Sequence, residues 1–190
     1  MSQSLTEKDY QAAASKLGVP VAAVKAVSSV ESSGNGFLAD GRPKILFERH
    51  IFKKRLIAKG IDTSKIPSGI CSSTPGGYLG GADEHERLDT AAKYDRDCAL
   101  ESASWGSFQV MGYHWKALGY PTLQAFINDQ YKAAGQLDTF VRFIKADPRL
   151  VKALKAKDWT SFASIYNGPA YAKNAYHTKM ASAYKQFGGV

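Results

Sequence analysis

The sequence predicts a mainly α fold with a small β element, and three observations support this prediction. Apolar residues recur at helical spacing along most of the chain. Only one short segment, residues 44–47, alternates as a strand does, with Ile45 and Phe47 on one side. Gly, Pro, Ser and Thr are concentrated in residues 61–81, which we expect to form a long irregular surface loop.

The helices can be placed by their start and stop signals. Thr6, followed by acidic residues, predicts a helix that reaches about Leu17 and ends at Gly18. Pro20 suits the first turn of a second helix over residues 21–33. Turn-forming residues then lead to the strand. The remaining predicted helices cover residues 50–59, 83–100, 122–128, 131–145, 148–156, 159–166 and 171–186.

Length and charge narrow the functional classes. A chain of 190 residues suits one domain, and 44% hydrophobic with 22% charged residues is typical of a globular protein. The formal net charge of +8 favours a polyanionic partner, although a solubilising surface would explain it too. The basic residues are scattered and no nucleic-acid motif accompanies them, so we expect no nucleic-acid partner.

Other features concern compartment and cofactors. The N-terminus lacks the apolar segment of a signal peptide and no apolar run is long enough to span a membrane, so we expect synthesis in the cytoplasm. Cys71 and Cys98 leave a single bridge open, but the pattern favours free thiols. The four His residues lack metal-ligand spacing, and no phosphate- or dinucleotide-binding motif is present. We therefore expect no metal and no cofactor.

Glu31 is the carboxylate best placed for acid chemistry. Steps of three and four residues put it on the same helical face as Val24 and Val27. Apolar surroundings raise the pKa of a carboxyl group, and glycoside cleavage requires such a protonated acid. The alternative is a glutamate that emerges into solvent where the helix ends.

Aromatic and amide side chains crowd two later segments. Rings, amides and hydroxyls suit sugars, which have apolar faces and a rim of hydroxyls. Each aromatic residue taken alone is better explained as core. The two segments contain Trp105, Phe108, Gln109, Tyr113 and Trp115, and then Tyr166, Asn167, Tyr171, Asn174 and Tyr176.

Three segments in a fixed order resemble a known family. Glu31-Ser32, residues 106–111 (GSFQVM) and Tyr166-Asn167-Gly168 are similar to the three motifs of goose-type lysozymes and lytic transglycosylases. A closer resemblance is to the N-acetylmuramidase domain of phage endolysins, in VESSGNGFLADGRPKILFERHIF, ALESASWGSFQVMGYHW and YNGPAYAKNAY. It spans about Thr6 to Phe187. It implies a lysozyme-like helical domain and a single catalytic muramidase domain over residues 1–190, without a separate wall-binding module.

The resemblance also implies roles for individual residues. Glu31 would be the general acid that cleaves the β-1,4 bond between N-acetylmuramic acid and N-acetylglucosamine by hydrolysis. Ser32 would orient Glu31 or the substrate acetamido group. Tyr166 and Asn167 would hold the sugar at the cut. Gln109 and the backbone of residues 106–111 would line the cleft, with Trp105 and Tyr113 as further sugar contacts.

A second carboxylate is less well determined. Glu48 and Glu101 are the main candidates beside Asp40, but Asp40 suits a turn, Glu48 suits an ion pair with Arg42 or Arg49, and Glu101 suits a cap or buttress. In the middle motif, Ser and Phe replace the Leu-Met that is usual in transglycosylases. A lytic transglycosylase, which gives 1,6-anhydro products, needs no second carboxylate and stays an alternative.

Two other classes compete with a glycosidase. A non-catalytic wall-binding module would explain the charge and the aromatics, and a zinc amidase is disfavoured by the His spacing. The partners we expect are peptidoglycan glycan strands and an anionic outer-membrane surface. We also expect the chain to act as a monomer. The family likeness alone implies a holin, which would permeabilise the membrane so that the chain reaches the periplasmic wall.

Overall fold

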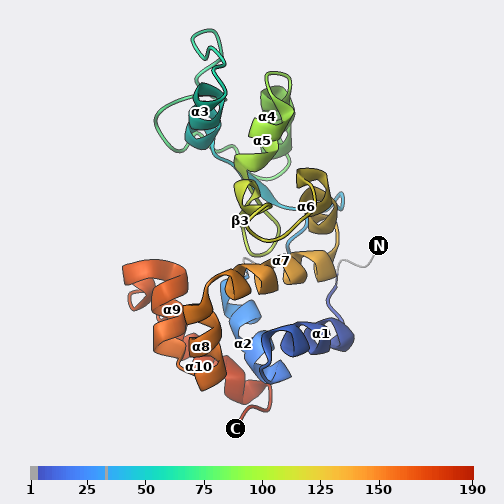
Figure 1. The fold of residues 1–190 in the computed structure, drawn as a ribbon, viewed down its shortest axis with the longest axis vertical. Coiled ribbons are helices and arrows are strands. Elements are labelled where there is room, and N and C mark those ends of the chain that lie inside the picture. Colours follow the sequence, from blue (N-terminus) through green and yellow to red (C-terminus); the bar gives the residue numbers. More distant parts are fainter. Residues whose placement is uncertain (1–3, 33) are drawn as a thin grey trace.

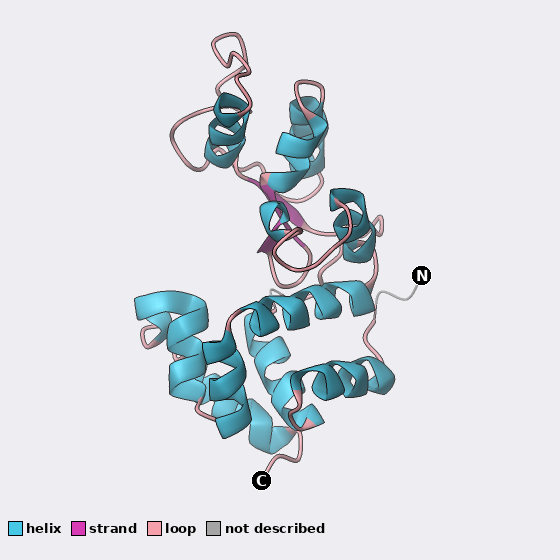
Figure 2. Ribbon diagram, viewed as in Figure 1, coloured by secondary structure: helices cyan, strands magenta, loops and turns pink. Residues whose placement is uncertain are grey.

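Helix α7 (Ala133–Ala146) lies across the middle of an elongated molecule and separates two groups of elements (Figure 1). The computed structural model describes residues 4–32 and 34–190. On one side, the helical lobe contains α1 (Glu7–Leu17), α2 (Val21–Glu31), α8 (Pro148–Ala156), α9 (Trp159–Asn167), η2 (Gly168–Tyr171) and α10 (Tyr176–Gln186). On the other side, the sheet lobe contains α3 (Arg49–Ala58), α4 (Asp83–Ala92), α5 (Arg96–Glu101), η1 (Gly112–His114), α6 (Leu123–Gln130) and the only strands of the described chain (Figure 2).

The first two helices follow their local sequence signals. Thr6 and Asp9 form a capping box, in which the Thr6 backbone N–H donates to the Asp9 carboxylate at 2.7 Å. Gly18 ends α1 in the left-handed conformation, with φ of 67°. Helix α2 is largely buried and ends at Glu31, with Ser32 already extended. Both predicted helices are present, but the second ends at Glu31, so the prediction is wrong for Ser32, and Ser33, its last residue, lies outside the described residues.

The small sheet is antiparallel, in the order β1-β2-β3. Strand β1 (Ile45–Phe47) was predicted, but β2 (Ala103–Trp105) and β3 (Val110–Met111) were not. Trp105 pairs with Ile45 on one side and with Val110 on the other. The two missed strands are only three and two residues long. Such short strands carry no alternating pattern that could reveal them.

The single helix predicted over residues 83–100 is wrong. The chain breaks between Ala92 and Arg96, and Asp95 caps α5 by accepting a hydrogen bond from the backbone N–H of Cys98 at 2.8 Å. The Lys59 ammonium group lies 2.9 Å from the same carboxylate. An aspartate that caps a new helix competes with continuation of the old one, which explains the break.

The predicted long loop is confirmed, since residues 61–81 contain neither helix nor strand. It is held rather than free. The guanidinium group of Arg49 donates to the carbonyl oxygens of Ser68, Thr74 and Pro75 at 2.9–3.2 Å. The loop is therefore fixed against the first turn of α3.

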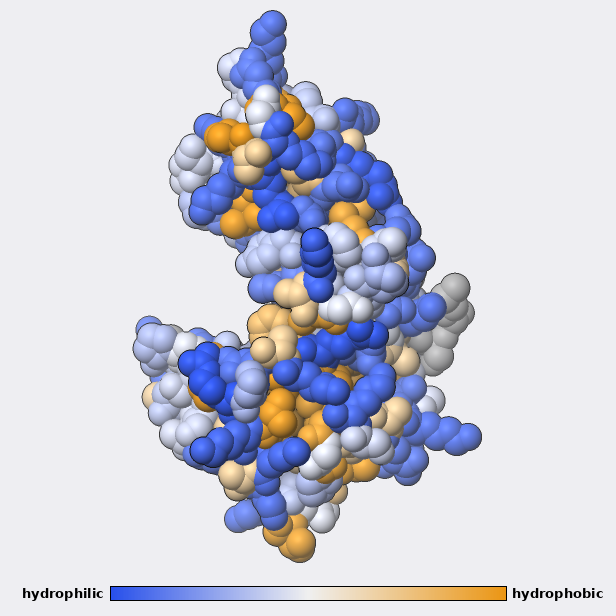
Figure 3. Space-filling model, viewed as in Figure 1, coloured by the Kyte–Doolittle hydropathy of each residue, from blue (hydrophilic) through white to orange (hydrophobic). Residues whose placement is uncertain are grey.

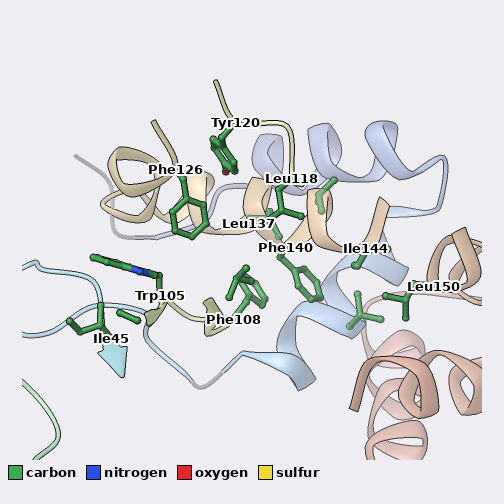
Figure 4. Packing of buried hydrophobic residues seen from close by; sticks show 14 of the residues in the cluster. Ile45, Trp105, Phe108, Leu118, Tyr120, Phe126, Leu137, Phe140, Ile144 and Leu150 are labelled. Atoms are coloured by element: carbon green, nitrogen blue, oxygen red, sulfur yellow. The ribbon is translucent and has the colours of Figure 1, made fainter. Parts of the chain in front are cut away.

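The hydrophobic core is continuous across α7 (Figure 4). The Phe108 ring, from the turn between β2 and β3, stacks on Phe140 of α7 with ring centroids 4.2 Å apart. Cys71 and Cys98 are buried and free, so the favoured interpretation of the cysteines is confirmed. Between residues 4 and 32 and from 34 onward, no single helix could cross a membrane, and α1 and α2 pass that test only as a pair bent by 104°.

Candidate functional site

Glu31 is the last residue of α2, and Asn167 is the last residue of α9. The Asn167 side-chain amide donates a hydrogen bond to Glu31 Oε1 at 2.8 Å. The two residues are 136 positions apart in the sequence. The fold thus brings the first and the third sequence motifs into direct contact.

The surroundings of Glu31 favour its protonated form. Burial raises the pKa of Glu31 from 4.5 to about 7, and the hydrogen bond from Asn167 lowers it only in part. Taking a carboxylate out of water penalises the charged form, and one neutral amide does not compensate as a cation would. Near neutral pH, Glu31 can therefore both hold and release a proton.

Tyr166 lies next to this pair within a cluster of aromatic rings. Its ring stacks on Phe162 at 5.9 Å and meets Phe140 and Phe143 edge-on, both at 5.7 Å. Burial, together with the negative charge of Glu31, raises the pKa of Tyr166 above its ordinary value. The phenol therefore stays neutral and can donate a hydrogen bond beside Glu31.

The molecule is hollowed where the two lobes face one another. Figure 3 shows a notch between the sheet lobe and the part of the helical lobe formed by α9 and α10. The C-terminal ends of α2 and α9, which carry Glu31 and Asn167, border this notch (Figure 1). Ser32, the C-cap of α2, lines a separate cavity of about 280 Å³ together with Ser28, Ser107 and Gln136.

Gln109 is used by the turn that contains it. The backbone of Gln109 has φ of 50°, which is unusual for a residue other than glycine. Its Oε1 accepts a hydrogen bond from Ser104 Oγ at 2.7 Å, and its Nε2 donates to the Gly106 carbonyl at 2.8 Å. These bonds fix the turn between β2 and β3. A sugar contact by Gln109 stays a prediction.

Two of the aromatic candidates differ sharply in exposure. Trp105 is 2% exposed, and its indole N–H donates to the Leu100 carbonyl at 3.1 Å. Its ring is packed in the core, although Trp105 also lines a cavity of about 850 Å³ between α4 and α6, and a sugar contact by Trp105 stays a prediction. Tyr113 is 37% exposed, and its ring lies 5.7 Å from the Arg55 guanidinium group.

Glu48 is the N-cap residue that precedes α3, and neighbours in the sheet lobe contact its carboxylate. The Tyr78 hydroxyl lies 2.8 and 2.9 Å from its two carboxylate oxygens. His50 Nδ1 lies 3.2 Å from Glu48 Oε2. The ion pair expected with Arg42 or Arg49 is not formed, because Arg42 binds Asp40 and Arg49 binds loop carbonyls. Asp40 is a turn residue, and its pKa is lowered chiefly by the hydrogen bond from the Arg42 side chain.

Glu101 joins three parts of the sheet lobe. Its carboxylate pairs with the Arg55 guanidinium group of α3 and accepts a hydrogen bond from Trp115 Nε1 at 2.8 Å. These contacts agree with the buttress that was weighed for it. Its predicted catalytic role has no contact with Glu31 to support it.

The sequence analysis missed a buried ion pair between Glu84 and Arg87. Glu84 is 0% exposed and accepts hydrogen bonds from the backbone N–H groups of Phe47, Leu79 and Gly80 at 2.7–3.2 Å. Burial alone would raise the pKa of Glu84, but these bonds and the Arg87 charge lower it overall. In the sequence, the run Glu84-His85-Glu86 favours an exposed acidic helix surface, and this prediction is wrong for Glu84 and His85, which are 0% and 5% exposed. Arg87 lies three residues from Glu84, but the Phe47 N–H comes from a strand 37 positions away, which no local pattern indicates.

Chemically, the described residues offer an acid but no evident metal site. Among residues 4–32 and 34–190, no group of three or more His, Cys, Asp and Glu side chains could hold a metal ion. A half-buried acid, a neutral amide and a neutral phenol meet at the edge of a notch instead. Such a site can protonate a leaving oxygen and hold a polar ring in place.

Comparisons with known proteins agree with this chemistry. The family model for muramidases, described as N-acetylmuramidase, matches residues 20–188. The chain is also similar to a solved structure, the endolysin of Burkholderia AP3 phage, with a TM-score of 0.94 and 47% identity, over 99% of this chain and 73% of that one. No match was found among curated proteins. The expected lysozyme-like helical fold with a small β element is confirmed.

Proposed function

This chain belongs to the N-acetylmuramidase family and is a peptidoglycan-degrading glycoside hydrolase, and we propose that Glu31 is its general acid. In this proposal the enzyme hydrolyses the β-1,4 bond between N-acetylmuramic acid and N-acetylglucosamine. The observation that carries it is the raised pKa of Glu31, at about 7. A catalytic acid is most effective when its pKa lies near the working pH. The other candidates, Glu48 and Glu101, are held by Tyr78 and Arg55 instead.

The proposed reaction assigns one task to each residue. The bond between the anomeric carbon and the bridging oxygen breaks while Glu31 gives its proton to that oxygen. Asn167, which donates to Glu31 Oε1, holds the carboxyl group in place. The neutral Tyr166 phenol faces the sugar or Glu31. Water then adds to the positively charged anomeric carbon, and the proton that it loses returns to the Glu31 carboxylate, so the acid is regenerated.

Two measurements on wall digests test this proposal. We expect Glu31→Gln to lower the rate of wall clearing by about 10²- to 10⁴-fold while circular dichroism shows an unchanged fold. A folded Glu31→Gln that clears walls near the wild-type rate would show that another group is the acid. Mass spectrometry should find reducing sugar ends. Dominant 1,6-anhydro products would contradict hydrolysis and favour the transglycosylase route, in which the substrate's own hydroxyl replaces water.

The anionic partner that we propose is the phosphate-bearing outer-membrane surface. Residues 145–190 contain eight Lys and Arg but only two Asp, so they carry +6 of the chain's +8. Of these cations Arg149 pairs with Asp147, Lys157 donates a hydrogen bond to the Val190 main-chain oxygen at 2.9 Å, and within the described chain no salt bridge to Asp or Glu forms at the seven lysines. Exposed lysines without an acidic partner attract phosphates at low ionic strength. They are Lys145, Lys152, Lys155, Lys157, Lys173, Lys179 and Lys185, all exposed.

Vesicle binding tests this surface directly. We expect the chain to bind anionic phospholipid vesicles at low salt, to bind zwitterionic vesicles weakly, and to be released as salt rises. Replacing Lys152, Lys155 and Lys185 by Glu should weaken binding about tenfold or more. The matched variant Lys65→Glu/Lys93→Glu/Lys116→Glu, in the sheet lobe, should weaken it less. If both variants lost the same vesicle affinity, binding would depend on the net charge alone, and this surface would have no special role.

We also propose that the chain serves in host lysis, because it is similar to the endolysin of Burkholderia AP3 phage. It would be made in the host cytoplasm and reach the periplasmic wall once the inner membrane is opened by a holin. Expression in the bacterial cytoplasm should then leave cells intact until a holin or chloroform is added. Rapid lysis on expression alone would contradict this route.

A further inference from the structure

Gln136 of α7 bonds two segments that are distant in the chain and also the nearby end of α6. It is 2% exposed. Its Oε1 accepts a hydrogen bond from the Ser107 backbone N–H at 2.8 Å. Its Nε2 donates to the carbonyl oxygens of Gly36 at 3.3 Å and Gln130 at 2.8 Å. Every bond of this amide therefore goes to main chain, so it can fix backbone positions.

Two glycines make room for this side chain. A Cβ atom at Gly36 would lie 2.1 Å from Gln136 Oε1, and one at Gly106 would lie 2.5 Å from Gln136 Cδ. Real Cβ atoms do not come so close, so neither position accepts alanine while Gln136 keeps its place. Two unrelated segments thus lack side chains where they meet one amide. This fit is specific for a side chain with the shape of Gln136.

The linked segments lead to the proposed site from both sides. Gly36 follows the end of α2, where Glu31 lies, and Ser107 belongs to the turn that also contains Gln109. Lys44 bridges them as well, since its N–H donates to the Gly36 carbonyl and its own carbonyl accepts from Gly106 N–H, both at 2.8 Å. Gln136 thus ties to α7 both the turn and the segment that follows α2, in which Gly36 lies five residues after Glu31.

We propose that Gln136 is a positioning residue for the muramidase reaction, which sets Glu31 relative to the turn formed by residues 106–109. The proposal rests on the assigned role of Glu31. Without the amide, both segments would keep their link through Lys44 but lose the hydrogen bonds that attach them to Gln136 of α7. Small displacements of a catalytic acid reduce turnover more than substrate binding.

The test compares Gln136→Leu with Thr139→Val, three residues further along α7. Thr139 is 1% exposed and its hydroxyl bonds Tyr120 and Gln130, so its loss also leaves buried polar groups unpaired without reaching the turn. We expect both variants to lose similar thermal stability. On soluble uncrosslinked glycan strands, Gln136→Leu should lower kcat at least tenfold with KM changed less than threefold, and Thr139→Val should keep kcat within threefold.

A second variant covers the case in which Gln136→Leu fails to fold. In Gln136→Glu, a protonated side chain can still donate to the Gly36 carbonyl, whereas the carboxylate would face two carbonyl oxygens. Its kcat, relative to wild type at the same pH, should therefore fall as pH rises from 5 to 8. Wild-type kcat in folded Gln136→Leu, or a flat ratio for Gln136→Glu, would overturn the positioning role. Active Glu31→Gln, measured alongside, would instead overturn the proposed function.

Discussion

Glu84 is a buried carboxyl group and Glu31 is a half-buried one, and their surroundings shift the two pKa values in opposite directions. Glu84 receives three backbone N–H groups and the Arg87 guanidinium group, which lower its pKa in spite of burial. Glu31 receives one neutral amide, and burial raises its pKa to about 7. Burial alone therefore does not identify an acid catalyst. What matters is how few donors the fold supplies to the charged form.

The number of donors to the carboxylate also distinguishes Glu31 from the remaining candidates. Glu101 has an arginine and an indole N–H, and Glu48 has a tyrosine hydroxyl with a histidine nearby. Both lie within the sheet lobe and support its packing. Of these acids, only Glu31 lies at the end of a helix that borders the notch and contacts the end of a second such helix, α9. Replacing each acid by its amide should therefore distinguish acids that contribute to stability from the acid that contributes to catalysis.

The largest effect on stability should come from Glu84→Gln. Removing one partner of a buried ion pair leaves Arg87 uncompensated, which typically costs about 3–5 kcal/mol. Urea denaturation at pH 7 measures the change in the free energy of unfolding. Glu86→Gln, an exposed acid on the same helix, is the matched control and should change it by less than about 0.5 kcal/mol. If Glu84→Gln lost less than about 1 kcal/mol, the proposed contrast between a stabilising Glu84 and a catalytic Glu31 would be wrong.

Glu31→Gln should have the opposite effect on stability. Because the folded-state pKa of about 7 exceeds the ordinary 4.5, the folded protein binds more protons than the unfolded chain between those values. Wild-type stability therefore falls as pH rises through this window, and the amide avoids that loss. We expect Glu31→Gln to be more stable by about 1–3 kcal/mol above pH 7 and equal below pH 4.5. Denaturation at pH 4 and pH 8 would refute this if the difference were the same at both.

Asn167→Ala should change both the rate and its pH dependence. The Asn167 hydrogen bond lowers the pKa of Glu31, so its removal should move the alkaline limb of the kcat profile to higher pH. The carboxyl group also loses its anchor, and we expect kcat to fall about tenfold, as for the loss of one hydrogen bond to a charged group. Asn174→Ala, at an exposed asparagine nearby in sequence, is the control. An unmoved alkaline limb would show that Asn167 does not tune Glu31.

The smallest effect should follow Glu48→Gln. The amide can still accept the hydrogen bond from Tyr78, so we expect wall clearing within about threefold of wild type. Initial rates on wall suspensions at pH 7 are sufficient. A fall of about a hundredfold would restore Glu48 as a second catalytic carboxylate, in keeping with the usual share of a general base.

Local signals in the sequence were enough for the elements that local contacts determine. Thr6, Gly18 and Pro20 place α1 and α2 because capping and turn preferences act within one helical turn. Asp95 shows the limit of this reasoning, since its capping role competes with a continuous helical pattern. The two short strands pair across the chain and leave no periodic trace in the sequence.

The candidate site was predictable only in part. Glu31 and Asn167 could be named because ordered motifs pointed to both, even though 136 positions separate them. Gln136 could not be found in this way. Its contact with Gly36 spans 100 positions, and a lone glutamine on an amphipathic helix has no pattern of its own. The burial of Glu84 was not predicted either, because it depends on packing against strand β1, whose Phe47 N–H is 37 positions away.

The most direct test of this account is the titration of Glu31 itself. Carbon-13 NMR of protein labelled at the glutamate carboxyl groups would follow each resonance with pH, and Glu31→Gln would identify the signal. We predict a midpoint near 7 for Glu31 in the wild-type enzyme. A midpoint near 4.5 would mean that the carboxyl group is ionised at neutral pH, and it would contradict the assignment of Glu31 as the proton donor.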